Sequence, residues 1–216
     1  MIPLLHDFEG ETVLAFGGGR VGARKARRFA READVVVVVS PAFVDESFGD
    51  AKRVRAAPGP GAVAGWVERT DPALVVAATD DEAVNGAAET AARERGILHN
   101  RADQHGERDP DSVVVPATVR DDPVVVAVGT GGTSPALSRY LREGVESEFA
   151  EAGAMADLTG ELREELQDRG LPVEERRAAV RAVVRSPEVW KALDSGSAKP
   201  RSVALDVIED VTGDLS

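Results

Sequence analysis

The sequence predicts an α/β fold, namely a doubly wound parallel sheet followed by a β-hairpin and a small C-terminal helical domain. Three observations favour this fold. Short valine-rich runs alternate with helical patterns over the first hundred residues, two further valine-rich runs flank a turn, and the chain is helical in pattern from Ser134 onward. This order of elements is typical of an α/β domain with a helical appendage.

Five apolar runs are spaced as strands of the parallel sheet. They are expected at residues 12–16, 35–39, 53–56, 74–78 and 97–99. Helices are expected at 20–31, in a short segment through Trp66, and at 82–95. Residues 35–39 are all valine, which suits a strand covered by helices on both faces. Crossover helices at these intervals predict the doubly wound topology.

The pattern changes after residue 110. Residues 113–116 and 124–128 are expected to form an antiparallel hairpin around a turn at 120–123. The helical remainder is interrupted near Gly153 and at 170–172, 186–187 and 196–200. We therefore predict three parts with bounds 1–110, 111–150 and 151–216.

The composition excludes several kinds of site and partner. The chain has 216 residues and no cysteine, so disulfides, thiolate metal sites and cysteine nucleophiles are excluded. Its 38 acidic and 26 basic residues give a net charge of −12, which argues against nucleic-acid binding. Lysine is scarce, and an acidic, lysine-poor surface indicates halophilic adaptation. The four lysines are Lys25, Lys52, Lys191 and Lys199.

Membrane and secretory signals are missing from the sequence. No apolar run reaches the roughly 20 residues that cross a bilayer. The start MIPLLHDFEGE has neither the basic residues nor the apolar stretch of a signal peptide. We therefore expect a cytoplasmic protein without a membrane partner.

A glycine-rich turn lies between the first strand and the first helix. Residues 17–22, GGGRVG, fit the pattern GxGxxG. Gly17 permits the tight turn, Gly19 lets backbone amides approach a pyrophosphate, and Gly22 lets the helix lie close to the strand. This context predicts a Rossmann-like dinucleotide-binding domain, and a purely structural turn is the alternative. Ser40 and Pro41 stand where an acidic residue usually grips the ribose, so the choice between NAD and NADP stays open at this position.

Five motifs resemble the family of precorrin-2 dehydrogenase and siroheme synthase. They are Pro3-Leu4, GGGRVGARKA at 17–26, VVAATDD at 75–81 with Asn85, GILHNRAD at 96–103, and VAVGTGGTSPALSRYLRE at 126–143. The resemblance covers about residues 1–150. It implies an NAD-dependent enzyme that oxidises precorrin-2 to sirohydrochlorin, and in some family members also inserts iron.

The resemblance also implies site residues. Asp103 occupies the place of the family's acid/base carboxylate, where it would take a proton from the macrocycle; the alternative is that Asp103 only caps a turn. This chain reads Arg101-Ala102-Asp103-Gln104-His105 where the family often has apolar residues. Asp80 has the alternative role of N-cap to the next helix. The implied cofactor-binding residues are Gly17, Gly19, Arg20, Val21, Gly22, Ser40, Pro41, Thr79 and Asp80.

A polycarboxylate substrate requires local positive charge on an acidic protein, and arginine suits carboxylates. The alternative is that these arginines only balance nearby acids. The expected substrate-binding residues are Arg101, Arg120, Thr133, Ser134 and Arg139, with Arg108 and Arg142 in the same group. His6, His99 and His105 lack the spacing of a metal-ligand set, so no metal site is predicted, although His105 is close enough to Asp103 to share in proton transfer.

By resemblance, residues 111–150 pair two subunits into a homodimer. The valine-rich hairpin agrees, because an isolated two-stranded sheet is marginally stable. The alternative function is a nucleotide-sensing module that regulates ion transport without catalysis. Such a sensor would keep an acidic residue after its second strand and has no need of the segment 126–143.

Overall fold

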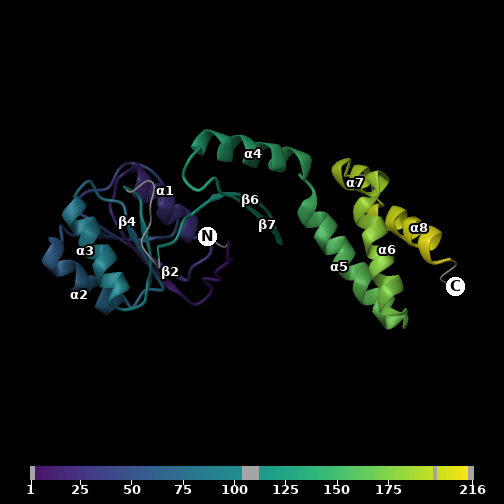
Figure 1. Ribbon diagram of the computed structural model, residues 1–216, viewed down its shortest axis with the longest axis horizontal. Helices are drawn as coiled ribbons and strands as arrows, with labels where there is room; N and C mark the ends of the chain where they lie inside the picture. The colour runs from purple at the N-terminus through teal and green to yellow at the C-terminus, as the bar shows by residue number, and fades with distance from the viewer. Residues whose placement is uncertain (1–2, 104–111, 197–198, 214–216) are drawn as a thin grey trace. The chain divides into compact units, whose positions relative to one another are not determined.

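The computed structural model describes residues 3–103, 112–196 and 199–213 (Figure 1). The chain divides into two compact units, Met1–Val115 and Pro116–Ser216. The first unit contains a five-stranded parallel sheet and the second contains a hairpin and five helices. These features confirm the predicted α/β fold with a hairpin and a helical C-terminal region.

All strands of the first unit run parallel, in the order β3-β2-β1-β4-β5. After the central strand β1 the chain builds outward through β2 and β3, and then returns to the other side of β1 for β4 and β5. Ligands of such sheets bind at this switch point, outside the carboxyl ends of the strands. The strands are β1 Thr12–Phe16, β2 Val35–Ser40, β3 Lys52–Arg55, β4 Leu74–Ala77 and β5 Leu98–Arg101.

Helices cover both faces of this sheet. Helix α1 (Arg20–Phe29) packs on the face that includes Val13 and Ala15. Helices α2 (Pro60–Thr70) and α3 (Glu82–Arg93) lie side by side on the face that includes Leu14 and Phe16 (Figure 1). Successive residues of β1 therefore serve opposite cores, which explains why the strand is apolar at every position.

The prediction of a strand at 113–116 is wrong. Ser112 forms a bridge with His99, and the Val113 amide donates to the His99 carbonyl at 2.8 Å. Val113 and Val115 pack with the α1 side of the core. The hairpin instead pairs β6 (Ala117–Asp121) with β7 (Val124–Val128). Three valines in a row have strong strand propensity. Here Val113 and Val115 cover the face of the parallel sheet, Val114 is exposed, and Pro116 offers no N–H for a ladder.

In the second unit, the hairpin is fastened to a helical core. The backbone N–H of Gly153 donates to Oδ2 of Asp121 at 2.7 Å. A Cβ at Gly153 would lie 2.4 Å from the Asp122 carbonyl oxygen, so only glycine permits this approach. The helices are α4 Pro135–Glu148, α5 Ala152–Asp168, α6 Val173–Arg185, α7 Pro187–Asp194 and α8 Pro200–Thr212.

The core of the second unit lies among α5, α6, α7 and α8. Leu162 and Leu166 of α5 are almost fully buried, as is Ile208 of α8. Within the described parts of the chain, no helix is both long enough and apolar enough to cross a membrane.

Replacing Leu162 by Ala should destabilise the helical core. The lost contacts and the cavity left behind predict a cost of about 2–5 kcal/mol in the free energy of unfolding, measured with denaturant. Val211→Ala is the control, since Val211 is 49% exposed and its loss should cost about 0.5 kcal/mol or less. Equal losses in the free energy of unfolding for the two variants would contradict the burial of Leu162 in this core.

Candidate active site

The glycine turn at the carboxyl end of β1 is packed against β4 and against α1. Gly17 has φ of 120°, and a Cβ there would lie 2.3 Å from the Ala78 carbonyl oxygen. A Cβ at Gly22 would lie 2.0 Å from the Gly17 carbonyl oxygen. These contacts leave room only for glycine, so the turn and the start of α1 are fixed at the switch point of the sheet.

The start of α1 is open to a ligand. Among the described residues no side chain caps this helix at its N-cap, Gly19, and the first turn of the helix has no acidic residue. A Cβ at Gly19 would meet no atom of the described parts of the chain within 4 Å. The start of α3 differs, since the Asp81 carboxylate accepts from Ala83 N at 2.9 Å and Val84 N at 3.2 Å. The backbone amides at the positive end of α1 therefore fit a dinucleotide pyrophosphate.

The segment after β2 forms a second wall of this site. A Cβ at Gly18 would lie 2.0 Å from the Ala42 carbonyl oxygen and 2.8 Å from Ser40 Oγ. The Val44 amide donates to the Gly18 carbonyl at 2.9 Å. Ser40 is therefore buried beside the glycine turn, while its neighbour Pro41 is exposed.

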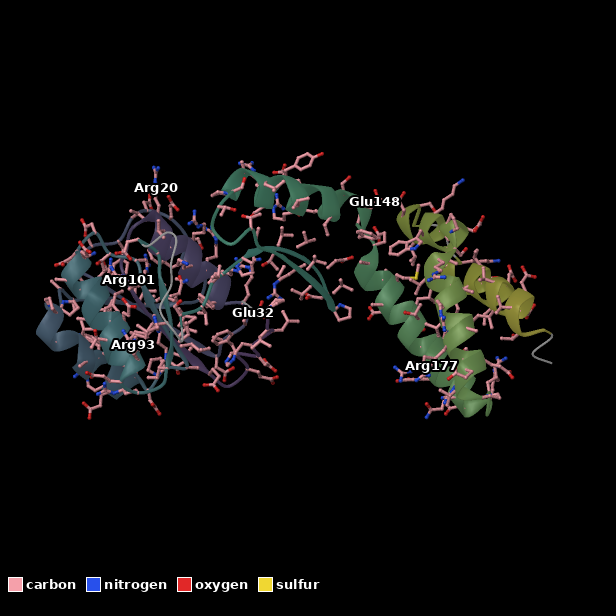
Figure 2. The ribbon with its side chains drawn as sticks, in the orientation of Figure 1. Arg20, Glu32, Arg93, Arg101, Glu148 and Arg177 are labelled. Atoms are coloured by element: carbon pink, nitrogen blue, oxygen red, sulfur yellow. The ribbon has the colours of Figure 1, made fainter. Side chains whose placement is uncertain are left out.

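Arg20 and Val21 lie on the open side of the turn. The Arg20 side chain, labelled in Figure 2, is 87% exposed and pairs with Glu46 at 3.3 Å. Val21 is 38% exposed. An exposed ion pair of this kind contributes little to stability, so Arg20 can exchange Glu46 for an anionic ligand at little cost.

Asn85 fixes the loop after β4. Its Oδ1 accepts from Thr79 N at 3.1 Å and Thr79 Oγ1 at 2.7 Å, and its Nδ2 donates to the Thr79 carbonyl at 3.0 Å. Asn85 is 1% exposed. The alternative role of Asp80 as N-cap is wrong, because Asp81 caps α3 and leaves Asp80 exposed. The Asp81 carboxylate, one residue later, accepts hydrogen bonds from the free backbone amides at the start of α3.

Asp103 follows β5 at the same edge of the sheet. Arg101 Nε donates to its Oδ1 at 3.1 Å, and Arg101 Nη2 donates to its Oδ2 at 2.6 Å. The Arg101 guanidinium holds the pKa of Asp103 below its usual range; partial burial opposes this shift and Asn85 adds to it. Asp103 is therefore ionised at neutral pH, as an acceptor of protons must be.

Arg101, labelled beside α3 in Figure 2, also binds Glu89 of that helix, with Nη1 3.0 Å from Oε2. The side chains of Arg101 and Glu89 are each 9% exposed, against 30% for Asp103. The pKa of Arg101 is raised by these two carboxylates, with Asp103 the larger cause. The guanidinium is thus a fixed positive charge between two carboxylates.

Sequence reasoning missed a second polar link at the end of β5. Lys25 Nζ of α1 donates to Asn100 Oδ1 at 2.5 Å, and Asn100 Nδ2 donates to the Val113 carbonyl at 2.7 Å. Asn100 is 4% exposed. The signal available in the sequence was the presence of a lysine in the first helix of a chain that has only four lysines.

The other predicted substrate residues belong to the second unit. Thr133 Oγ1 donates to the Thr130 carbonyl at 2.6 Å, and Ser134 caps α4 by accepting from Leu137 N at 3.3 Å. Arg139 is 78% exposed and pairs with Glu143 at 2.9 Å. Arg120 is exposed on β6. His105 and Arg108 lie outside the described residues, and among those described no cluster of three acidic or histidine side chains could hold a metal ion.

A family model and several known proteins match this chain. A family model described as "Putative NAD(P)-binding" matches residues 4–117. A precorrin-2 dehydrogenase of Methanosarcina barkeri is 31% identical over 215 residues, which are 96% of this chain and 93% of that protein. A siroheme synthase of Stutzerimonas stutzeri is 31% identical over 97% of this chain, but the chain spans only 44% of that protein.

One solved structure has the same fold along its whole length. It is SirC, a precorrin-2 dehydrogenase, with a TM-score of 0.69 and 21% sequence identity. The match covers 97% of this chain and 100% of SirC.

Two glycine variants should separate folding from cofactor binding. Gly19→Ala places a methyl group in the open space above α1, so it should raise the Kd for NAD at least about tenfold with little change in melting temperature. Gly22→Ala forces the turn apart, so it should lower both the melting temperature and the affinity. Fluorescence titration with NADH and thermal melting measure the two effects. Unchanged NADH binding by Gly19→Ala would contradict the site.

Proposed function

Because the chain belongs to the precorrin-2 dehydrogenase and siroheme synthase family, we propose that it oxidises precorrin-2 to sirohydrochlorin with NAD as the electron acceptor. One observation of the structure carries the proposal. The ionised carboxylate of Asp103 follows β5 at the same sheet edge as the open start of α1. An anion-binding helix end and a proton acceptor are the two parts that such an oxidation needs.

The residues present fit NAD, whose nicotinamide accepts two electrons as hydride. The amides around Gly19 would hold the pyrophosphate, while Ser40 and Pro41 lie at the end of β2, where a ribose binds in this fold. One carbon–hydrogen bond of precorrin-2 loses its hydrogen as hydride, and the macrocycle also releases a proton. Asp103 takes that proton. The balance is precorrin-2 and NAD⁺ giving sirohydrochlorin, NADH and a proton.

A regulatory nucleotide sensor is not favoured. The match to the precorrin-2 dehydrogenase relative extends over nearly the whole chain. The hypothesis of a nucleotide sensor is supported by the glycine turn alone. Moreover, β2 ends at Ser40 and not at an acidic residue. A sensor of that kind would keep an acidic residue there to bind the ribose.

The proposal extends to a homodimer formed through the hairpin and α4. Helix α4 buries none of its residues, and Leu137, Tyr140 and Leu141 are 47%, 72% and 43% exposed. The hairpin, the end of α4 and the start of α5 line an open cavity of about 270 Å³. It is lined by Val119, Asp121, Val124, Val126, Val145, Phe149 and Ala152. Apolar surface of this extent is typical of an interface between subunits.

The catalytic proposal is tested by mixing the protein with precorrin-2 and NAD. The assay is run in molar salt, since we also propose that the net charge of −12 adapts the protein to high ionic strength. NADH absorbance and sirohydrochlorin should appear together. Asp103→Asn should slow their formation by about 100-fold or more, because the amide cannot accept the proton. The Kd for NAD should stay nearly unchanged.

Asp71→Asn is the control for this substitution. Asp71 ends α2 in the left-handed conformation, which asparagine also tolerates, so its activity should equal that of the wild type. Full activity of Asp103→Asn would remove Asp103 from the mechanism. Nucleotide binding by the wild type without turnover would support the sensor instead.

The dimer proposal predicts a mass of twice 22.8 kDa in sedimentation equilibrium. Tyr140→Glu should shift the protein toward the monomer, because it buries a charge in the proposed interface. Val211→Glu, at an exposed apolar position of α8, should leave the dimer intact. A monomeric wild type at micromolar concentration would contradict the proposal.

A further inference from the structure

The guanidinium of Arg101 binds two carboxylates of the protein itself. Nε and Nη2 bind the two oxygens of Asp103, and Nη1 binds Glu89. The two bonds to Asp103 form a parallel fork, which fixes the plane of a carboxylate as well as its position. An arginine held in this way orients Asp103 and is not free to bind a substrate carboxylate with the same donors.

Helix α3 supplies the anchor for this arrangement. Glu89 lies one helical turn after Asn85, so both side chains project from the same face. Asn85 also helps to lower the pKa of the Asp103 carboxyl. Glu89 acts on Asp103 only through Arg101. Asn85 and Glu89 are buried, with 1% and 8% of the whole residue exposed, respectively. The helix that carries them is capped by Asp81 and packs on the sheet.

The burial of this group makes each partner depend on the others. A buried charge is costly unless it is paired, so removing one member leaves another uncompensated. His99 of β5 also faces Glu89, with Nε2 3.6 Å from Oε1, and is 2% exposed. Neither of its ring nitrogens has a hydrogen-bond partner in the described part of the chain. The close hydrogen bond to Glu89 comes from Arg101, whose Nη1 donates to Oε2 at 3.0 Å.

We propose that Glu89 and Arg101 are positioning residues for the oxidation: Glu89 holds the guanidinium of Arg101, and the fork of Arg101 holds the Asp103 carboxylate in the orientation in which it meets the substrate. This inference rests on the proposed function, because it takes Asp103 as the proton acceptor. It assigns Arg101 to that carboxylate in place of a substrate carboxylate. The assignment also gives a buried glutamate of α3 a part in the reaction.

The test uses Arg101→Met, Arg101→Lys, Glu89→Gln and the double variant Glu89→Gln/Arg101→Met. Asp103 must be ionised to accept a proton, so the rate falls as the pH drops through its pKa. Arg101 keeps that pKa below its usual range. Arg101→Met should therefore move the acid limb of the rate profile to higher pH and lower kcat about tenfold or more, with an unchanged Kd for NAD. Arg101→Lys keeps the charge without the fork, so it should restore the acid limb but only part of kcat.

The double variant isolates the part played by Glu89. If Glu89 works through Arg101, Glu89→Gln lowers kcat when Arg101 is present and has no further effect when Arg101 is methionine. The double variant also removes both buried charges. If Arg101→Met alone does not fold, the acid limb and kcat of the double variant are compared with those of Glu89→Gln, and the difference reports on Arg101. Equal effects of Glu89→Gln in both backgrounds would overturn the role of Glu89. Glu94→Gln, at the exposed end of the same helix, is the control and should behave as the wild type.

A carbon-13 NMR titration of the Asp103 carboxyl, assigned with Asp103→Asn, measures the same effect without turnover. The titration midpoint should rise in Arg101→Met. A wild type that does not oxidise precorrin-2 would overturn the proposed function, and this titration would still report on the Arg101 contact. An active wild type whose acid limb and midpoint are unchanged in Arg101→Met would overturn the positioning role alone.

Discussion

The close approach of backbone at the glycine turn is the constraint on which the site depends. The Ala78 carbonyl oxygen lies 2.3 Å from the place of a Cβ at Gly17, and the Gly17 carbonyl oxygen lies 2.0 Å from the place of a Cβ at Gly22. These contacts join the ends of β1 and β4 to the start of α1. Because no side chain caps that helix, its amides are left for a ligand at the point where the strand order reverses.

The proton-accepting half of the site has a different basis. Asp103 leaves β5 on an irregular segment, so the backbone alone does not fix its carboxylate. Helix α3 supplies that order through Asn85 and through Glu89 with Arg101. A side chain is held more firmly by charged hydrogen bonds from a rigid helix than by its own loop. The edge of the sheet therefore places the start of α1 and Asp103 on the same side, and α3 holds the Asp103 carboxylate in position.

Much of the fold could be predicted because its signals are local. Valine runs mark the buried strands, and Gly17, Gly19 and Gly22 mark the turn. Residues 113–116 were mispredicted, because strand propensity does not say which surface a valine run covers. Asp80 and Asp81 are adjacent, so composition could not decide which one caps α3. The pairs Lys25 with Asn100 and Glu89 with Arg101 are 75 and 12 residues apart, and only the folded sheet brings them together.

The central claim is that one edge of the parallel sheet holds both the dinucleotide and the ionised Asp103. A crystal structure with bound NAD tests it most directly, through the position of the nicotinamide relative to the Asp103 carboxylate. The account predicts that the pyrophosphate contacts the amides at the start of α1 and that the nicotinamide lies on the side of the sheet edge that holds the Asp103 carboxylate. A pyrophosphate bound elsewhere, or an Asp103 carboxylate turned away from the nicotinamide, would contradict it.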